Sequence, residues 1–309
     1  MNKKLLYEKL FYEALRIRLV EERIIELYPS DKIQSPVHLS IGQEAVAVGL
    51  CNQLKLDDWS FINYRGHAFY LAKGGPMPEL FAELYGKQTG LSKGKAGSMH
   101  LAAPAQGVMG ASAVVGSTIS HAVGAALASK IRGESRVFVA VFGDGATEQG
   151  AYHESLNFAS LHSLPVLFLC ENNGWAVHSP LRERQSFTLG KHALAYGVDS
   201  LIVEDGFDFV KISETCEYVL NHIRDKSKPI LLEVKTCRYK EHVGPGDDFD
   251  AGYRGIQEIE AWKAKDPLML DRQLFDKYFP QISKEIDCAV EFAESSPFPT
   301  IKDLLTDVI

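Results

Sequence analysis

Two short polar motifs are the features of this sequence whose residue types and spacing could do chemistry. The first is Gly143-Asp144-Gly145, and the second is Asn172-Asn173, with 26 residues between them. A carboxylate and an amide oxygen are hard ligands of the kind that Mg²⁺ prefers, and Mg²⁺ completes its coordination with phosphate oxygens and water. Each motif alone is typical of an ordinary tight turn. Together they predict a metal and diphosphate site in which Asp144 and Asn173 face one ion.

The segments around these motifs explain why the two should meet. Arg136 to Phe142 and Pro165 to Cys170 are apolar runs of strand length, and a helix is predicted between them from about Thr147 to His162. This order is a βαβ unit with parallel strands. The loops at the carboxyl ends of neighbouring parallel strands lie side by side, and ligands bind there. The amino end of the helix would direct its N–H groups to the same place.

Further patterns extend this unit into a larger sheet. Leu201 to Val203 and Pro229 to Val234 predict two more strands, and Phe209 to Ile223 predicts the helix that joins them. Ser40 and Gln43 form a capping-box pattern that would open another helix. We therefore predict an α/β fold with a doubly wound, mainly parallel sheet flanked by helices.

Helical patterns also lie at both ends of the chain. Apolar residues recur at helical spacing from Leu5 to Tyr28, and helical patterns resume from Gly255 to Glu294. We expect a single domain over residues 1–309, with its core at about 36–240 and a helical C-terminal extension at about 255–309.

Composition excludes several classes of protein. The 309 residues carry a formal net charge of −7 without a block of like charges, so neither nucleic acid nor a membrane surface is an expected partner. No run of about 18 apolar residues suggests a membrane span. The five cysteines form no Cys-x-x-Cys pair or regular framework, and the first residues do not resemble a signal peptide. A cytoplasmic protein is expected.

Longer sequence words identify a family resemblance. With the two polar motifs, the chain resembles the α subunit of the thiamine diphosphate-dependent 2-oxo acid dehydrogenases of the pyruvate and acetoin type, the dehydrogenase E1 component family. The words that carry the resemblance are His38-Leu39-Ser40-Ile41-Gly42-Gln43-Glu44-Ala45, Tyr64-Arg65-Gly66-His67, Lys93-Gly94-Lys95-Ala96-Gly97-Ser98-Met99-His100, Cys170-Glu171-Asn172-Asn173 and the terminal Leu304 to Ile309. They span nearly the whole chain.

The resemblance implies a role for each of several residues in a thiamine diphosphate-binding fold. The metal ligands would be Asp144, Asn173 and the main-chain carbonyl of Trp175. The residues implied to meet the diphosphate are Tyr64, Arg65, Gly145, Ala146 and Arg238, and main chain at Ala113 and Val115 would meet the aminopyrimidine. His38 and His242 would face the substrate end, with His67 nearby, and His242 would also touch the cofactor.

The resemblance also implies an activity and partners. The cofactors would be thiamine diphosphate and Mg²⁺, and the substrate a 2-oxo acid or α-hydroxyketone of the pyruvate, acetoin or branched-chain type. The acyl unit would pass to an acceptor such as the lipoyl group of an acyltransferase. A separate β subunit, in an α₂β₂ heterotetramer, would supply the glutamate that activates the cofactor.

Departures from the family pattern leave alternatives open. Lys240-Glu241-His242-Val243 keeps only the last histidine of the family's His-Gly-His-Ser, so regulation by phosphorylation of that serine is not expected. A non-oxidative carboligase or a transketolase-like half enzyme is the first alternative, and a non-catalytic regulatory subunit is the second. The loop from Gly244 to Gly252, with three aspartates and no evident apolar anchor, is expected to be mobile.

Overall fold

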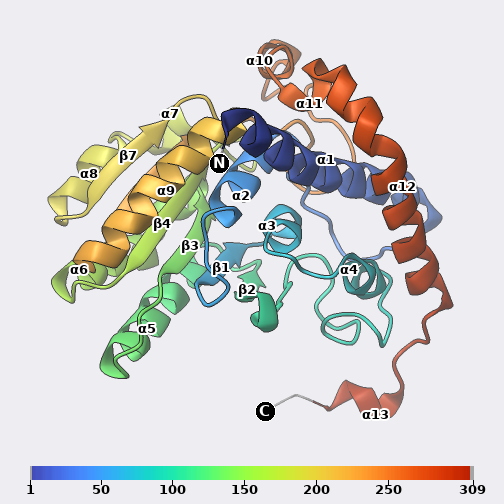
Figure 1. Ribbon diagram of the computed structural model, residues 1–309, viewed down its shortest axis with the longest axis horizontal. Coiled ribbons are helices and arrows are strands. Elements are labelled where there is room, and N and C mark those ends of the chain that lie inside the picture. The colour runs from blue at the N-terminus through green and yellow to red at the C-terminus, as the bar shows by residue number, and fades with distance from the viewer. Residues whose placement is uncertain (1, 307–309) are drawn as a thin grey trace.

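A six-stranded parallel sheet forms the centre of the computed structural model, which describes residues 2–306 (Figure 1). The strand order is β2-β1-β3-β4-β8-β7. The strands are β1 (Trp59–Asn63), β2 (Val108–Ser112), β3 (Phe138–Gly143), β4 (Val166–Asn172), β7 (Asp199–Val203) and β8 (Ile230–Lys235). The predicted fold class, a parallel sheet flanked by helices with helical additions at both ends, is confirmed.

Helices cover both faces of the sheet (Figure 1). The core on one side of the sheet includes residues of α1 (Lys3–Leu27), α2 (Glu44–Cys51), α3 (His67–Ala72), α4 (Met77–Leu84), α9 (Phe209–Lys226) and α12 (Arg272–Ser295). The other face packs against α5 (Ser117–Ile131), α6 (Gly150–Leu161) and α8 (Leu189–Ala195). The remaining helices are α7 (Leu181–Arg184), α10 (Ile256–Lys263), α11 (Pro267–Leu270) and α13 (Ile301–Leu304), and three 3₁₀ turns are η1 (Tyr28–Ser30), η2 (Pro104–Gln106) and η3 (Asp144–Glu148).

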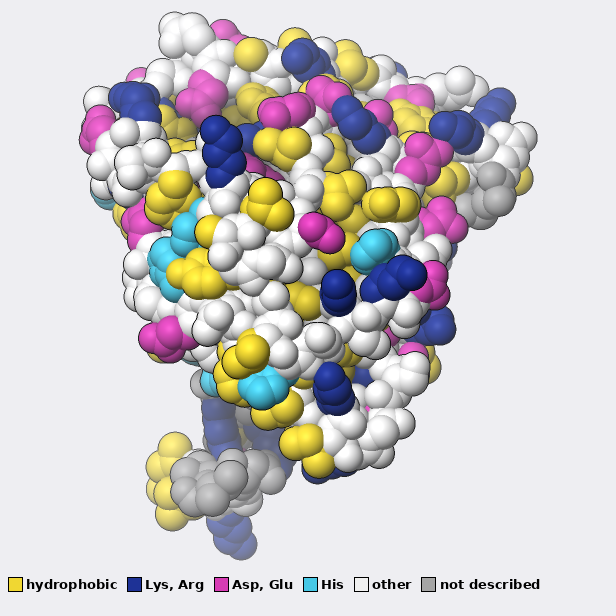
Figure 2. Space-filling model, turned by 90° about the vertical axis from the view of Figure 1, so that its left-hand side faces the viewer, with side chains coloured by type: hydrophobic (Ala, Val, Ile, Leu, Met, Phe, Trp, Pro, Cys, Tyr) yellow, Lys and Arg dark blue, Asp and Glu magenta, His cyan; other side chains and the backbone are white. Residues whose placement is uncertain are grey.

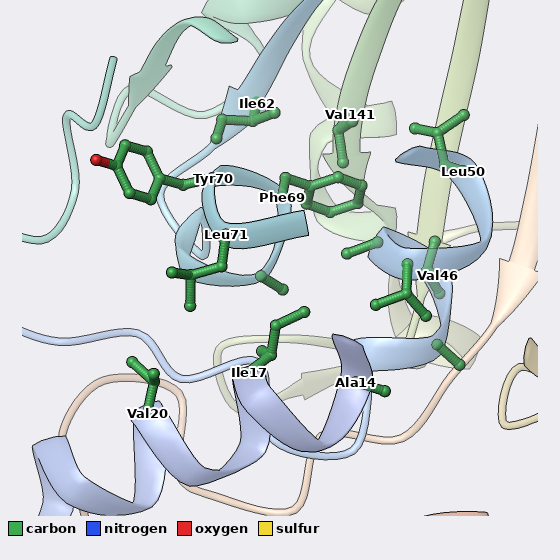
Figure 3. Packing of buried hydrophobic residues seen from close by; sticks show 14 of the residues in the cluster. Ala14, Ile17, Val20, Val46, Leu50, Ile62, Phe69, Tyr70, Leu71 and Val141 are labelled. Atoms are coloured by element: carbon green, nitrogen blue, oxygen red, sulfur yellow. The ribbon is translucent and has the colours of Figure 1, made fainter. Parts of the chain in front are cut away.

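Strand β3 shows how the apolar runs build these two cores. Val139 and Val141 belong to the core under α1, whereas Phe138, Ala140 and Phe142 belong to the core under α5 and α6. Side chains alternate between the faces of a strand, and a strand buried on both faces therefore reads as a continuous apolar run. Figure 3 shows α3 packed between α1 and the sheet, with Phe69 and Leu71 among the side chains that fill this core.

The pairing of β3 with β4 brings the two polar motifs together. Gly143 pairs with Glu171 in the last step of this parallel register. Asp144 directly follows β3, and Asn173 directly follows β4, so both residues lie at the carboxyl edge of the sheet. The predicted meeting of the two motifs is confirmed.

Two local predictions were wrong, and three elements were missed. Ser40 does not cap a helix, because its hydroxyl and amide both donate to buried Glu21, and α2 begins only at Glu44. The segment after β3 first forms the 3₁₀ turn η3, so α6 begins at Gly150 and not near Thr147. Strands β1 and β2 and helix α3 were not predicted.

The ends of the chain pack as helical additions. Helix α12 packs against α1 and α4, which places the C-terminal extension beside the N-terminal helix (Figure 1). Within residues 2–306, no helix combines the length and apolar character that crossing a membrane requires. The last three residues of the segment Leu304 to Ile309 lie outside the described residues. The single-domain organisation stays a prediction.

The surface shown in Figure 2 mixes charges of both signs. Basic and acidic side chains alternate there among scattered hydrophobic and histidine side chains, without a continuous basic stripe on this face.

Candidate functional site

A cavity of about 270 Å³ lies at the carboxyl edge of the sheet, at the ends of β1, β3 and β4. Most of the predicted site residues line it, and they are Tyr64, Arg65, Val115, Asp144, Gly145, Ala146, Asn173, Trp175 and His242. His38, His67, Ala113 and Arg238 are not among its lining residues.

Asp144 has the properties of a metal ligand. Its side chain is 1% exposed, and one carboxylate oxygen pairs with the Arg184 guanidinium while the other, Oδ1, is buried without a hydrogen-bond partner in the described structure. Burial raises the pKa of Asp144 above its ordinary value, and the neighbouring Arg184 opposes that rise. A buried carboxylate oxygen without a partner is costly, so Oδ1 fits a cation.

Asn173 faces the same cavity and is held by its neighbours. Its amide nitrogen donates to Gln43 Oε1 at 2.9 Å, and its Oδ1 accepts the Trp175 backbone N–H at 3.1 Å. This leaves a further lone pair on Oδ1 for a ligand. No cluster of three or more His, Cys, Asp or Glu side chains suited to a metal occurs among residues 2–306. The donor set here is instead one carboxylate, one amide and main chain, which suits Mg²⁺.

A small hairpin covers the turn that carries Asp144. It consists of β5 (Trp175–Ala176) and β6 (Ser179–Pro180), followed by α7. A Cβ atom at Gly145 would lie 2.8 Å from the Cβ of Ala176, so only glycine allows the hairpin to approach the turn η3 this closely. Arg184 at the end of α7 pairs with both Asp144 and Glu148.

Arg65 is a buried cation in the cavity wall. Its Nη1 donates to the Leu39 carbonyl at 2.6 Å and its Nη2 to the His242 carbonyl at 3.1 Å. Burial, with the positive charge of Arg238 nearby, lowers the pKa of Arg65 to about 10. An anion placed beside these two guanidinium groups would relieve their repulsion, as a diphosphate would.

Arg238 lies behind the cavity wall and is engaged by the loop that follows it. Its Nη1 donates to Asp248 at 3.1 Å, and its Nη2 is buried without a partner in the described structure. Asp248 is itself buried, accepts from Arg254 at 2.7 Å and pairs with Tyr253. The free Nη2 fits an additional acceptor such as a phosphate oxygen.

These contacts correct the expectation for the loop from Gly244 to Gly252. The reason given for mobility was the absence of anchors, and this reason is wrong. Asp248 is fixed by two arginines, and Phe249 packs partly buried against the main core.

Three rings gather where the substrate end was predicted. The ring centroids of His38 and Tyr64 lie 4.5 Å apart, and those of His38 and His242 lie 5.3 Å apart. Burial and the charge of Arg65 lower the pKa of each histidine to about 3, so both are neutral near pH 7. His38 Nδ1 is buried without a partner in the described structure. A neutral imidazole with an unused nitrogen can hold or accept a proton.

Two further predicted residues do not line the cavity. His67 is 0% exposed between Glu21 and Ser98, so it does not reach the substrate end. Ala113 stands next to Val114 and Val115, which do line the cavity.

Sequence reasoning missed Gln43 and Glu171, two polar residues that line the cavity, and Arg184, which pairs with the lining residues Asp144 and Glu148. Gln43 contacts both Asn173 and Glu171, whereas the sequence suggested for it only a role in helix capping and a place in a family motif. Glu171 is the single acidic residue in the apolar run of β4, and burial raises its pKa to about 7. A single charged residue in an apolar strand could have marked Glu171 as a candidate site residue. Nothing in the sequence marks Arg184, which reaches Asp144 from 40 residues away.

The lowered pKa of His38 gives a prediction for stability. Below pH 6.5 the unfolded chain binds a proton at this histidine, whereas the folded chain does so only near pH 3. The stabilisation from neutral His38 is therefore present above pH 6.5 and is lost as the pH falls toward 3. Urea denaturation of the purified chain at pH 7 and pH 5 should show that His38→Gln removes about 1–2 kcal/mol of the pH dependence of the unfolding free energy.

The exposed His100 provides the matched control for this measurement. His100→Gln makes the same change at a surface histidine and so controls for the substitution itself. Equal pH dependences for wild type and His38→Gln would show that His38 is not held neutral.

Comparison with known proteins agrees with this site. The dehydrogenase E1 component family matches residues 12–302 of this chain. The α subunit of acetoin:2,6-dichlorophenolindophenol oxidoreductase from Bacillus subtilis is 35% identical, over 97% of this chain and 92% of the relative. Pyruvate dehydrogenase E1 component α subunits from Rickettsia prowazekii and Rhizobium meliloti are 34% and 35% identical, over 98% and 97% of this chain and 95% and 89% of the relatives. The match over nearly the full length confirms the resemblance, and this chain belongs to the dehydrogenase E1 component family of oxidoreductases, which implies thiamine diphosphate as its cofactor.

Proposed function

We propose that this chain is the α subunit of an enzyme that uses thiamine diphosphate and Mg²⁺ to decarboxylate or cleave a 2-oxo acid or an α-hydroxyketone. The substrate is of the pyruvate, acetoin or branched-chain type, and the acyl unit passes to an acceptor such as lipoyl. The observation that carries the proposal is the free, buried Oδ1 of Asp144 beside Asn173 in the cavity. This pair meets the needs of a metal that carries a diphosphate.

The residues of this chain divide the work of holding the cofactor. Asp144, Asn173 and the Trp175 carbonyl would hold Mg²⁺. Tyr64, Arg65, Gly145, Ala146 and the free Nη2 of Arg238 would bind the diphosphate, and main chain at Ala113 and Val115 would meet the aminopyrimidine. When bound, the cofactor supplies a nucleophilic thiazolium carbon and accepts the electrons released on carbon–carbon cleavage.

The ring cluster would serve the substrate end. His38 and His242 are neutral and partly enclosed, so either can hold the substrate carboxylate through an N–H or accept a proton. His67 would act on the site only through neighbouring residues, because its side chain is fully buried.

Exposed apolar side chains at the mouth of the cavity are evidence for a partner subunit. Val114, Val115 and Val177 line the cavity, yet 67%, 43% and 44% of their surfaces are exposed. Apolar side chains around an open site are suited to cover by another protein surface. A β subunit in an α₂β₂ assembly would cover this mouth and supply the activating glutamate, and a lipoyl-bearing acyltransferase would be the next partner. We propose that the enzyme is located in the cytoplasm.

The proposal is tested with the chain and its β partner purified together. Reduction of 2,6-dichlorophenolindophenol would be measured with pyruvate, branched-chain 2-oxo acids and acetoin, with and without thiamine diphosphate and Mg²⁺. Turnover that needs both cofactors is expected with one substrate class. Product analysis with and without a lipoyl acceptor separates this function from a carboligase or transketolase-like one. Failure of the complex to bind the cofactor would leave the regulatory-subunit alternative.

Removal of either arginine should weaken cofactor binding. Arg65→Ala and Arg238→Ala should each weaken binding of thiamine diphosphate by about 1.5–3 kcal/mol, because each loses charge-assisted hydrogen bonds to the diphosphate. Quenching of tryptophan fluorescence gives the Kd. Arg224→Ala is the control, because Arg224 pairs with Asp58 at the opposite edge of the sheet. An unchanged Kd would remove that arginine from the diphosphate site.

A further inference from the structure

A buried hydrogen-bond network centred on Glu21 lies behind the cavity wall. Glu21 belongs to α1 and does not line the cavity. We propose that Glu21 is a positioning residue, which through Ser40 and His67 fixes the two segments that carry His38 and Arg65. What these segments bind rests on the proposed function. The hydrogen bonds of Glu21 do not depend on that function.

The contacts of Glu21 use both carboxylate oxygens. The Ser40 backbone N–H donates to each oxygen at 2.9 Å, and the Ser40 hydroxyl donates to Oε1 at 2.9 Å. His67 Nδ1 lies 3.1 Å from the same Oε1. Because a carboxylate only accepts hydrogen bonds, His67 must carry its proton on Nδ1 toward Glu21. The side chains of Glu21 and His67 are both 0% exposed, and a fully buried glutamate requires such partners.

The network continues from His67 to a serine. His67 Nε2 lies 2.8 Å from Ser98 Oγ, so serine, histidine and glutamate stand in the order of a hydrolase triad. A nucleophilic serine must be open to its substrate, but Ser98 is fully buried and outside the cavity lining. The same hydrogen bonds can therefore hold segments in place, but they cannot support acyl transfer.

Ser40 connects Glu21 to the substrate end. It lies in the loop segment 36–41, and the Leu39 carbonyl in this segment accepts Arg65 Nη1 at 2.6 Å. Two further carbonyls of the segment, at Val37 and Ile41, accept backbone N–H groups from Gly244 and Tyr239 at 2.8 and 2.9 Å. These two donors bracket His242. A displacement of Ser40 would thus reach every segment that contributes to the ring cluster.

His67 connects Glu21 to the diphosphate side. It is the first residue of α3 and stands two residues after Arg65. Figure 3 shows α3 lying between the sheet and α1, with Ile17 and Val20 of α1 on the side of Leu71. Apolar contacts of this kind are not directional, whereas hydrogen bonds are. The apolar core therefore holds α1 against α3, and Glu21 fixes their relative position.

Asp58 provides a matched control for Glu21. It is also a buried carboxylate, it accepts backbone N–H groups from Lys55 at 2.8 Å and Val137 at 2.9 Å, and it pairs with Arg224. It precedes β1 and therefore lies at the amino edge of the sheet, opposite the cavity. Asp58→Asn should cost stability without moving the site.

The test compares Glu21→Gln with Asp58→Asn in the assembled enzyme. Glu21→Gln should lower kcat/KM by about 10- to 100-fold, the cost of misplacing reacting groups, while its loss of thermal stability stays similar to that of Asp58→Asn. Asp58→Asn should keep kcat/KM within about twofold. A kcat/KM for Glu21→Gln equal to that of Asp58→Asn would overturn the proposal.

A milder variant and a second readout keep the test decisive. If Glu21→Gln does not fold, Ser40→Ala removes only the hydroxyl contact and should lower kcat/KM about 2- to 10-fold relative to Asp58→Asn. Amide hydrogen exchange needs no turnover, and it should rise in segment 36–41 only in the Glu21 and Ser40 variants. A complex without cofactor-dependent activity would contradict the proposed function, while unchanged exchange in segment 36–41 would contradict the role of Glu21.

Discussion

Asp144→Ala is expected to abolish thiamine diphosphate-dependent activity, with a loss on the order of 10³-fold or more. The variant removes the only carboxylate proposed to hold Mg²⁺, and with it several kcal/mol of electrostatic stabilisation, of which each 1.4 kcal/mol is a factor of ten in rate. The fold should change little, because Asp144 lies in the turn after β3 and Arg184 keeps Glu148 as a partner. Steady-state rates at saturating and at low cofactor would measure the loss.

The matching control is Asp144→Asn, which keeps the size of the side chain and removes its charge. It should lose most of the activity as well, with circular dichroism and thermal unfolding close to wild type. Normal activity of Asp144→Ala in Mg²⁺ at low cofactor concentration would show that the metal lies elsewhere.

The second large effect concerns the partner. This chain alone should bind the cofactor weakly and turn over no substrate, whereas the complex with its β partner should be active. The reason is that no residue of this chain is assigned to activate the aminopyrimidine, and the valines at the cavity mouth lack a cover. Activity of the separate chains, of their mixture and of the co-purified complex would be compared at equal concentrations.

The negative result for the chain alone needs a control for folding. Circular dichroism should show the helix content of the intact fold, and adding the partner to the same sample should restore turnover. Full activity of this chain in the absence of any partner would contradict the half-site interpretation.

The sheet was predictable where strands are long and buried on both faces. β3, β4 and β8 read as apolar runs, and the position of Asp144 and Asn173 followed from the geometry of parallel strands. β1 was missed because the polar residues Ser60 and Asn63 interrupt its apolar run, and β2 because it contains Gly110 and Ala111, which have low strand propensity. Their place in the sheet is decided by pairing with β3 and with each other.

Contacts between distant segments account for what the sequence could not show at the site. The capping pattern at Ser40 was local and plausible, but Glu21, 19 residues earlier, takes both of its donors. The loop after Arg238 looked unanchored in the sequence, because Asp248 anchors it only when Arg254 folds back and pairs with this carboxylate. Residue type suggested the candidate metal ligands, whereas the partners that orient them could be seen only in the fold.

The central claim is that this chain holds the metal and diphosphate end of a thiamine diphosphate site. Calorimetric titration of thiamine diphosphate into the complex, with Mg²⁺ or with a chelator, tests it most directly. We expect one cofactor bound for each copy of this chain, binding that requires Mg²⁺, and loss of that binding in Asp144→Ala but not in Asp58→Asn. Binding in Asp144→Ala that equals wild type, or no binding to the wild-type complex, would contradict it.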